Sequence, residues 1–281
     1  MFTSTAHVSA PLDATAVLVD LRNFTPNLKA SPVGADGSNV FCELLAHFYG
    51  ICVEAAIIAV GASDTPPMYL NSTGDGVLMV FFDPDHHYRH GFLTTLMLNC
   101  TLRSVCETYN AEHGRPGVPT TSFGIGIESG QVCRVTDTGR GGDVVVETYI
   151  GDCINVAARA EGFTKSVHET HAIVGVHTNS LLCRALCDAN YQRLMNVALD
   201  QEIDDDARLA IHDEMMTLNR RLCLTFMQVT VLKGVDEPIP LFRVSKQRAR
   251  TENAQFQSLV QMLTRSPEHK AAVMSFLDRL A

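Results

Sequence analysis

Residues 68–82 read MYLNSTGDGVLMVFF, and residues 15–20 read TAVLVD. In the first stretch two strand-like runs, 68–73 and 77–82, flank Gly74-Asp75-Gly76, and a short glycine-rich turn between such runs predicts a β-hairpin. The second stretch is apolar and rich in β-branched residues, so it predicts a buried strand that delivers Asp20 to its end. A sheet that pairs these strands side by side would bring the carboxylates of Asp20 and Asp75 to one point.

Strands and helices alternate in the rest of the chain. Apolar residues recur at helical spacing from Phe41 to Cys52, and a long helical pattern covers residues 86–112. A strand-rich block follows, and helical segments occupy much of residues 179–219. Further strands are predicted at 122–128, 131–136, 144–149, 172–176, 224–232 and 240–244, and a further helix at 152–161. Antiparallel hairpins among alternating elements predict an α+β fold, with a mixed sheet and flanking helices.

The composition is that of a globular protein. The chain has 281 residues, 46% hydrophobic and 19% charged, with a net charge of −9, so the basic surface expected of a nucleic-acid-binding protein is missing. Nine cysteines are scattered without a CxxC pair, which favours reduced thiols. The N-terminus carries no signal sequence, and no stretch reads as long and uncharged enough to cross a bilayer. We therefore expect a cytoplasmic protein without a nucleic-acid or membrane partner.

Several segments, taken in order, resemble class III adenylate and guanylate cyclases over residues 14–245. They are VLVDLRNFT at 17–25, TGDG at 73–76, YIGDCINVAAR at 149–159 and LKG at 232–234. A fifth, IGIESGQV at 125–132, is similar to the strand-and-turn motif of the family, with Glu128-Ser129 where His-Thr is usual. The resemblance implies a ferredoxin-like mixed sheet, active as a dimer. It also implies conversion of a nucleoside triphosphate to a 3′,5′-cyclic monophosphate and pyrophosphate, a phosphorus–oxygen lyase reaction.

Metal binding is implied for the strand-end carboxylates. By resemblance, Asp20 and Asp75 bridge two divalent cations, Mg²⁺ or Mn²⁺, and the carbonyl of Leu21 is a further ligand. Oxygen donors suit these hard cations, which would activate the ribose 3′-hydroxyl and neutralise the phosphates. Taken alone, each residue has a plainer interpretation, with Asp20 ending a strand and Asp75 occupying a turn.

Asn155 and Arg159 stand four residues apart on the helix predicted from Asp152, so they project from one face. In the family these positions orient the ribose and stabilise charge on the α-phosphate, and the planar fork of an arginine suits the second task. The family also divides each site between two protomers. Since this chain carries both halves, the resemblance implies a homodimer with two composite sites.

Phosphate contacts are expected at the turn after Asp20, and the resemblance implies further contacts from two basic residues. Free backbone N–H groups at a helix start can bind phosphate oxygens. Phe24 itself is expected to pack in the protein interior. The candidates are Asn23, Phe24, Thr25, Lys233 and Arg140.

The base-reading positions depart from both purine patterns. Asn71 stands where adenylate cyclases have Lys and guanylate cyclases have Glu. Thr148 stands where adenylate cyclases have Asp and guanylate cyclases have Cys. In a cyclase without a recognisable sensor domain, this pair is similar to the pyrimidine cyclases of Pycsar anti-phage defence, which make cyclic UMP or cyclic CMP. Tyr49 and Tyr69 are candidates for closing a small base pocket. The alternatives are an adenylate cyclase with an unusual base pocket and a degenerate domain that binds nucleotide without turnover.

Three parts are predicted: an extension at 1–13, a catalytic domain at 14–246 with an acidic helical insertion at about 180–222, and a tail at 247–281. In the tail, Ser266-Pro267 starts an amphipathic helix whose apolar face should dock on the core or on a partner subunit. One further cluster can be interpreted as a metal site but is better explained as a helix cap with exposed histidines. It comprises Asp83, Asp85, His86, His87 and His90.

Overall fold

The computed structural model describes most of the chain, namely residues 5–31, 33, 39–61, 67–138, 144–167, 171–186, 205–234, 238–245 and 251–280.

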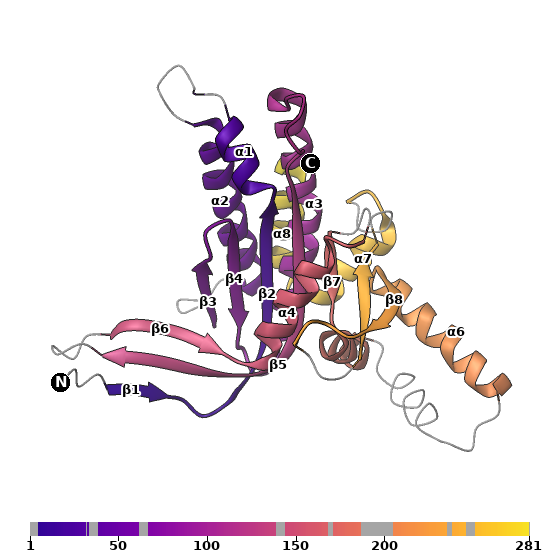
Figure 1. The fold of residues 1–281 in the computed structure, drawn as a ribbon. Coiled ribbons are helices and arrows are strands. Elements are labelled where there is room, and N and C mark those ends of the chain that lie inside the picture. The colour runs from indigo at the N-terminus through magenta and orange to yellow at the C-terminus, as the bar shows by residue number, and fades with distance from the viewer. Residues whose placement is uncertain are drawn as a thin grey trace.

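A mixed β-sheet forms the centre of the molecule (Figure 1), and its strand order is β3-β4-β2-β5-β7-β9-β8. Neighbouring strands are antiparallel except β5 and β7, which are parallel. The predicted α+β class is therefore confirmed. The strands are β2 (Leu12–Arg22), β3 (Met68–Ser72), β4 (Gly76–Phe81), β5 (Ser122–Thr138), β7 (Ala172–Val174), β8 (Leu224–Thr230) and β9 (Ile239–Val244).

Strand β5 is continuous, so the prediction of two strands at 122–128 and 131–136 is wrong. Its first half pairs with β2, and its second half pairs with β1 (Thr5–Val8) and β6 (Val144–Ile150). The second half of β5 forms, together with β1 and β6, an arm that extends beyond the main sheet (Figure 1). Ser129 and Gly130 do not break the strand because they stay in register with Thr15 and Ala14 of β2.

Helices cover both faces of the sheet. Val17, Val19 and Leu21 of β2 face a core shared with α2 (Val40–Val60) and α3 (His87–His113). The alternate residues Ala14 and Ala16 face α4 (Asp152–Phe163). Helix α4 lies very close to β5, since a Cβ added to Gly126 would come within 1.9 Å of the Ala157 carbonyl oxygen.

The C-terminal tail packs on the same core, which confirms the predicted docking. It forms α7 (Ala254–Leu263) and α8 (Pro267–Leu280), and α8 lies against α3 and α2. The sequence did not predict α7. The buried apolar side chains of the tail join those of α2 and α3 in one cluster, and they are Phe256, Leu259, Val260, Leu263, Val273, Phe276 and Leu277.

Helix α2 corrects one expectation from the sequence. By length and apolar composition it is able to span a membrane, although no such stretch was expected. The helix carries only two carboxylates, Glu43 and Glu54, and this low charge makes its composition apolar enough for a bilayer. In the structure its side chains Phe48, Ile51 and Cys52 are buried in the main core.

Within the described ranges, the remaining helices are α1 (Phe24–Ala30), a helix at 176–186 and α6 (Asp205–Arg221). The predicted insertion at about 180–222 owes its acidic character to a run of five carboxylates at 200–206. Asp205 and Asp206 begin α6, whereas Asp200, Glu202 and Asp204 lie outside the described residues.

Candidate active site

Strand pairing brings Asp20 and Asp75 together. Asp20 on β2 lies opposite Gly76 on β4, and the N–H of Leu21 donates to the Asp75 carbonyl at 2.9 Å. Glycine is required at position 76, because an added Cβ would lie 2.7 Å from the Val19 carbonyl oxygen and 3.1 Å from Asp20 Oδ1. The hairpin tip is thereby pressed against the end of β2, with its carboxylate beside that of Asp20.

The two carboxylates affect each other electrostatically. Burial raises the pKa of Asp20, the neighbouring charge of Asp75 raises it further, and the ammonium of Lys165 opposes both effects. Lys165 Nζ lies 3.4 Å from Asp20 Oδ2 and 3.7 Å from Glu161 Oε2. Negative charge is thus concentrated here and only partly neutralised.

A cavity of about 530 Å³ opens at this point. Its lining offers hard oxygen donors from Asp20, Asp75 and the backbone at Leu21, which fit Mg²⁺ or Mn²⁺. Among the described residues no group of three or more His, Cys, Asp or Glu side chains could hold a metal ion. The donor set therefore suits cations that keep water or phosphate oxygens as further ligands. The lining residues are Asp20, Leu21, Arg22, Asn23, Asp75, Ser122 and Lys165.

The turn after β2 leads directly into α1. Asn23 has a left-handed backbone with φ 59°, and its side chain donates to the Thr120 carbonyl at 2.8 Å. Phe24 packs against Phe41, with ring centroids 5.5 Å apart, and Thr25 is exposed. Of this segment only Asn23 lines the cavity. Phe24 packs against its neighbours as expected, but it is half-buried rather than in the interior.

Asn155 and Arg159 lie on α4 as predicted, on one exposed face of the helix, while Cys153, Ala157 and Ala160 are buried against the sheet. Neither residue lines the cavity that holds Asp20. Within a single chain the structure therefore keeps this pair apart from the carboxylates.

Of the two basic phosphate candidates, Lys233 is exposed on a turn next to buried Leu232, and it does not line the cavity. Arg140 lies outside the described residues.

The base candidates divide between the two faces of the sheet. Tyr69 donates to the Glu147 carbonyl at 3.0 Å and packs on Tyr149, whereas Asn71, two residues further along β3, is exposed. Thr148 lies on β6 beside Glu147 and is half-buried. Tyr49 packs with the α2 core on the other face, and its hydroxyl donates to the Gly74 carbonyl. The structure thus brings Tyr69 close to the β6 segment, and Tyr49 instead supports the hairpin that carries Asp75.

Sequence reasoning missed Glu161 and Lys165. Their spacing of four along the chain, directly after Arg159, was the available signal. Glu161 is 4% exposed, and its Oε1 has no hydrogen-bond partner. Arg22 donates to Thr164 Oγ1 close by.

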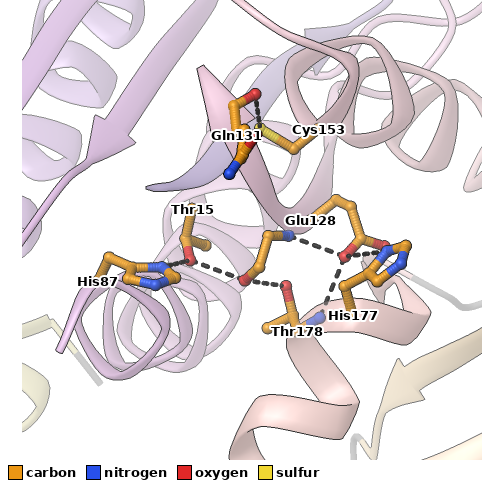
Figure 2. Close-up of polar contacts among 8 residues, drawn as sticks. Thr15, His87, Glu128, Gln131, Cys153, His177 and Thr178 are labelled. Carbon is orange, nitrogen blue, oxygen red and sulfur yellow. Dashed lines mark hydrogen bonds and ion pairs between the residues drawn. The ribbon is translucent and has the colours of Figure 1, made fainter. Parts of the chain in front are cut away.

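A second polar network lies further along β5 (Figure 2). Glu128 is 1% exposed, and its Oε1 accepts from the backbone N–H groups of Ser129 at 2.8 Å and Thr178 at 3.0 Å. A chain of side-chain hydrogen bonds, each 2.8 Å long, links Thr178 to Ser129, Thr15 and His87. Hydrogen bonding to Glu128 also raises the pKa of His177. The network joins β2, β5, α3 and the helix 176–186.

The expectation of exposed histidines at the start of α3 is wrong. His87 and His90 are buried, because the first turn of α3 packs between β2 and the tail. His87 bonds to Thr15, and Arg265 donates to His90 Nε2 at 3.2 Å. Asp83 also pairs with Arg265, so this cluster attaches the tail to α3.

No family model and no curated protein sequence matches the chain. Solved structures do match. The adenylyl cyclase CyaB from P. aeruginosa superposes with a TM-score of 0.52 at 14% identity, over 85% of this chain and 96% of that one. A bacterial light-regulated adenylyl cyclase matches with a TM-score of 0.52 at 16% identity, over 94% of this chain and 58% of that one. The chain therefore has the fold of the class III cyclase domains, a mixed sheet with flanking helices.

Proposed function

We propose that the chain is a nucleotide cyclase that converts a nucleoside triphosphate to a 3′,5′-cyclic monophosphate and pyrophosphate. The observation that carries the proposal is the convergence of Asp20 and Asp75 on one cavity beside Leu21. The fold does not require the carboxylates of a turn residue and of a residue near the end of β2 to lie side by side. Burial raises the pKa of Asp20, and the neighbouring charge of Asp75 raises it further, so placing them together is unfavourable. Cation binding supplies a reason for this arrangement.

The site would hold two divalent cations, Mg²⁺ or Mn²⁺, through Asp20, Asp75 and the Leu21 carbonyl. When bound, they supply the Lewis acidity that activates the 3′-hydroxyl and neutralises the phosphates. The segment Asn23–Thr25 would bind phosphate oxygens through its backbone N–H groups, as α1 begins at Phe24. Lys233 and Arg140 are proposed to neutralise the terminal phosphates.

Asn155 would orient the ribose, and Arg159 would stabilise the charge that builds on the α-phosphate. Both are exposed on α4 and absent from the Asp20 cavity of their own chain. We therefore propose a homodimer in which these residues complete the site of the partner subunit. In this proposal residues 14–246 are the catalytic domain, and the protein works in the cytoplasm, where nucleotides are available.

For the base we propose a pyrimidine, so that the product is cyclic UMP or cyclic CMP. Asn71 and Thr148 are neutral and lack the charged purine-reading side chains. Tyr69 is held against β6 next to Thr148 by its bond to the Glu147 carbonyl. Two neutral side chains such as Asn71 and Thr148 would discriminate only modestly between the bases. A strong preference for pyrimidines over purines would therefore come from the limited space beside Tyr69. The biological role proposed with this product is anti-phage signalling through a separate effector.

Two experiments test the function. The purified protein is incubated with each of the four ribonucleoside triphosphates and Mn²⁺, and cyclic products are separated by chromatography. We expect UTP or CTP to give the highest kcat/KM. ATP as the best substrate would make this an adenylate cyclase with an unusual base pocket, and no product from any triphosphate would favour a nucleotide-binding domain without turnover. Plating phage on cells that express wild-type or Asp20→Ala protein tests the defence role, which requires protection by the wild type alone.

A further inference from the structure

One charged residue beside the candidate metal site has no role in the function proposed so far. Lys165 follows α4 in a turn, and its ammonium reaches back to Asp20, a residue 145 positions earlier in the chain. Its Nζ lies within reach of two acceptors, Asp20 Oδ2 at 3.4 Å and Glu161 Oε2 at 3.7 Å. It also lines the cavity between the carboxylates. The ammonium therefore occupies the region to which a cation bound by Asp20 would be drawn.

We propose that Lys165 is the internal counter-ion of the Asp20–Asp75 pair, and that a divalent cation binds by displacing its ammonium from Asp20 toward Glu161. This inference rests on the proposed function, because it takes Asp20 and Asp75 as the metal-binding carboxylates. In the metal-free protein the lysine reduces the repulsion between the two carboxylates. It thereby stabilises the folded state and lowers the affinity of the site for cations.

The surroundings of Lys165 allow its ammonium to move from Asp20 to Glu161. The Lys165 side chain is 53% exposed, so it can move without disturbing the core. Glu161 by contrast is buried, with one carboxylate oxygen lacking any hydrogen-bond partner, so it remains in place as an acceptor. The i, i+4 spacing of Glu161 and Lys165 keeps the two side chains within reach of each other.

The test is Mn²⁺ binding to the full chain, stripped of metal and free of nucleotide. Free Mn²⁺ is followed by electron paramagnetic resonance, and melting temperatures are measured with and without Mn²⁺. We expect Lys165→Met to bind Mn²⁺ about two- to fivefold more tightly than wild type, the upper part of the range that the coupling of an exposed ion pair gives. The same variant should melt at a lower temperature without metal. Lys165→Arg should stay close to wild type, and so should Lys29→Met, which removes an exposed lysine on α1.

In Lys165→Met we expect tighter Mn²⁺ binding together with a lower melting temperature. This combination distinguishes a counter-ion from a purely structural salt bridge. A structural role would lower the melting temperature and leave Mn²⁺ affinity unchanged. Unchanged or weaker binding by Lys165→Met, together with lost binding by Asp20→Asn, would overturn the counter-ion role and leave the metal site standing. If Asp20→Asn and wild type behave alike toward Mn²⁺, the metal site itself is wrong, and the proposed function fails with it.

Discussion

Glu128 gives the most direct test of how the sheet is attached to the helix 176–186. Its Oε1 is the acceptor for two backbone N–H groups, those of Ser129 and Thr178, and both residues are buried. Glu128→Ala leaves both donors without a partner. An unpaired buried donor costs about 1–3 kcal/mol, so the two together cost about 2–6 kcal/mol. Removing a buried carboxylate recovers part of this, and we expect a net loss of about 2–4 kcal/mol.

Two further variants refine the test. Glu128→Gln keeps an acceptor oxygen but loses the charge, so we expect a smaller loss of about 1–2 kcal/mol. In Gly175→Ala the new Cβ would meet Glu128 Oε2 at 1.6 Å, which forces the carboxylate out of place. Its effect should therefore resemble that of Glu128→Ala. Since the alanine at 128 frees the space, the double variant should be no less stable than Glu128→Ala alone, and the two losses should not add.

The assay is urea unfolding followed by circular dichroism at 222 nm, because the chain contains no tryptophan to report fluorescence. The free energy of unfolding is compared among wild type, the single variants and the double variant. A free energy of unfolding for Glu128→Ala within about 0.5 kcal/mol of wild type would contradict the role given to the Glu128 carboxylate, and so would full additivity of the losses of Glu128→Ala and Gly175→Ala.

Further expected outcomes concern the site, the tail and pH. Asp20→Ala or Asp75→Ala should abolish cyclisation without lowering the melting temperature, since each removes a repelling carboxylate; activity within tenfold of wild type at saturating Mn²⁺ would contradict this. Asp20→Ala mixed with Arg159→Ala should regain activity after subunit exchange, and demonstrated heterodimers without activity would exclude composite sites. Deleting residues 246–281 should strongly lower the melting temperature, because the buried side chains of α7 and α8 leave the core; an unchanged melting curve would count against it. Burial lowers the pKa of His90 from 6.5 to about 3. Between these pH values the unfolded state binds a proton at His90 and the folded state does not, so the free energy of unfolding should fall as pH drops from about 6.5 toward 3. Urea unfolding at several pH values should show a shallower fall in His90→Gln, and an identical fall would remove His90 as a cause.

Local patterns in the sequence were sufficient for most secondary structure. The hairpin around Asp75, the strand that carries Asp20 and the helix that begins at Asp152 were all predicted, because alternation, turn glycines and helical spacing are local signals. The strand runs two residues past the predicted end at Asp20, to Arg22. The convergence of Asp20 and Asp75 followed from these elements once their strands were taken as neighbours. The apolar face of the tail also predicted docking, although α7 was missed.

The tertiary structure decided what depends on contacts between distant residues. Lys165 reaches Asp20 across 145 positions, and Glu128 bonds to Thr178 across 50, so no local pattern could reveal either contact. The continuity of β5 through Ser129-Gly130 depends on its register with β2, which local turn propensity does not report. The burial of His87 and His90 likewise depends on elements that pack against α3 from far along the chain. Local sequence patterns were thus enough for most of the elements and for the two carboxylates, whereas the packing of distant segments set which charges surround them.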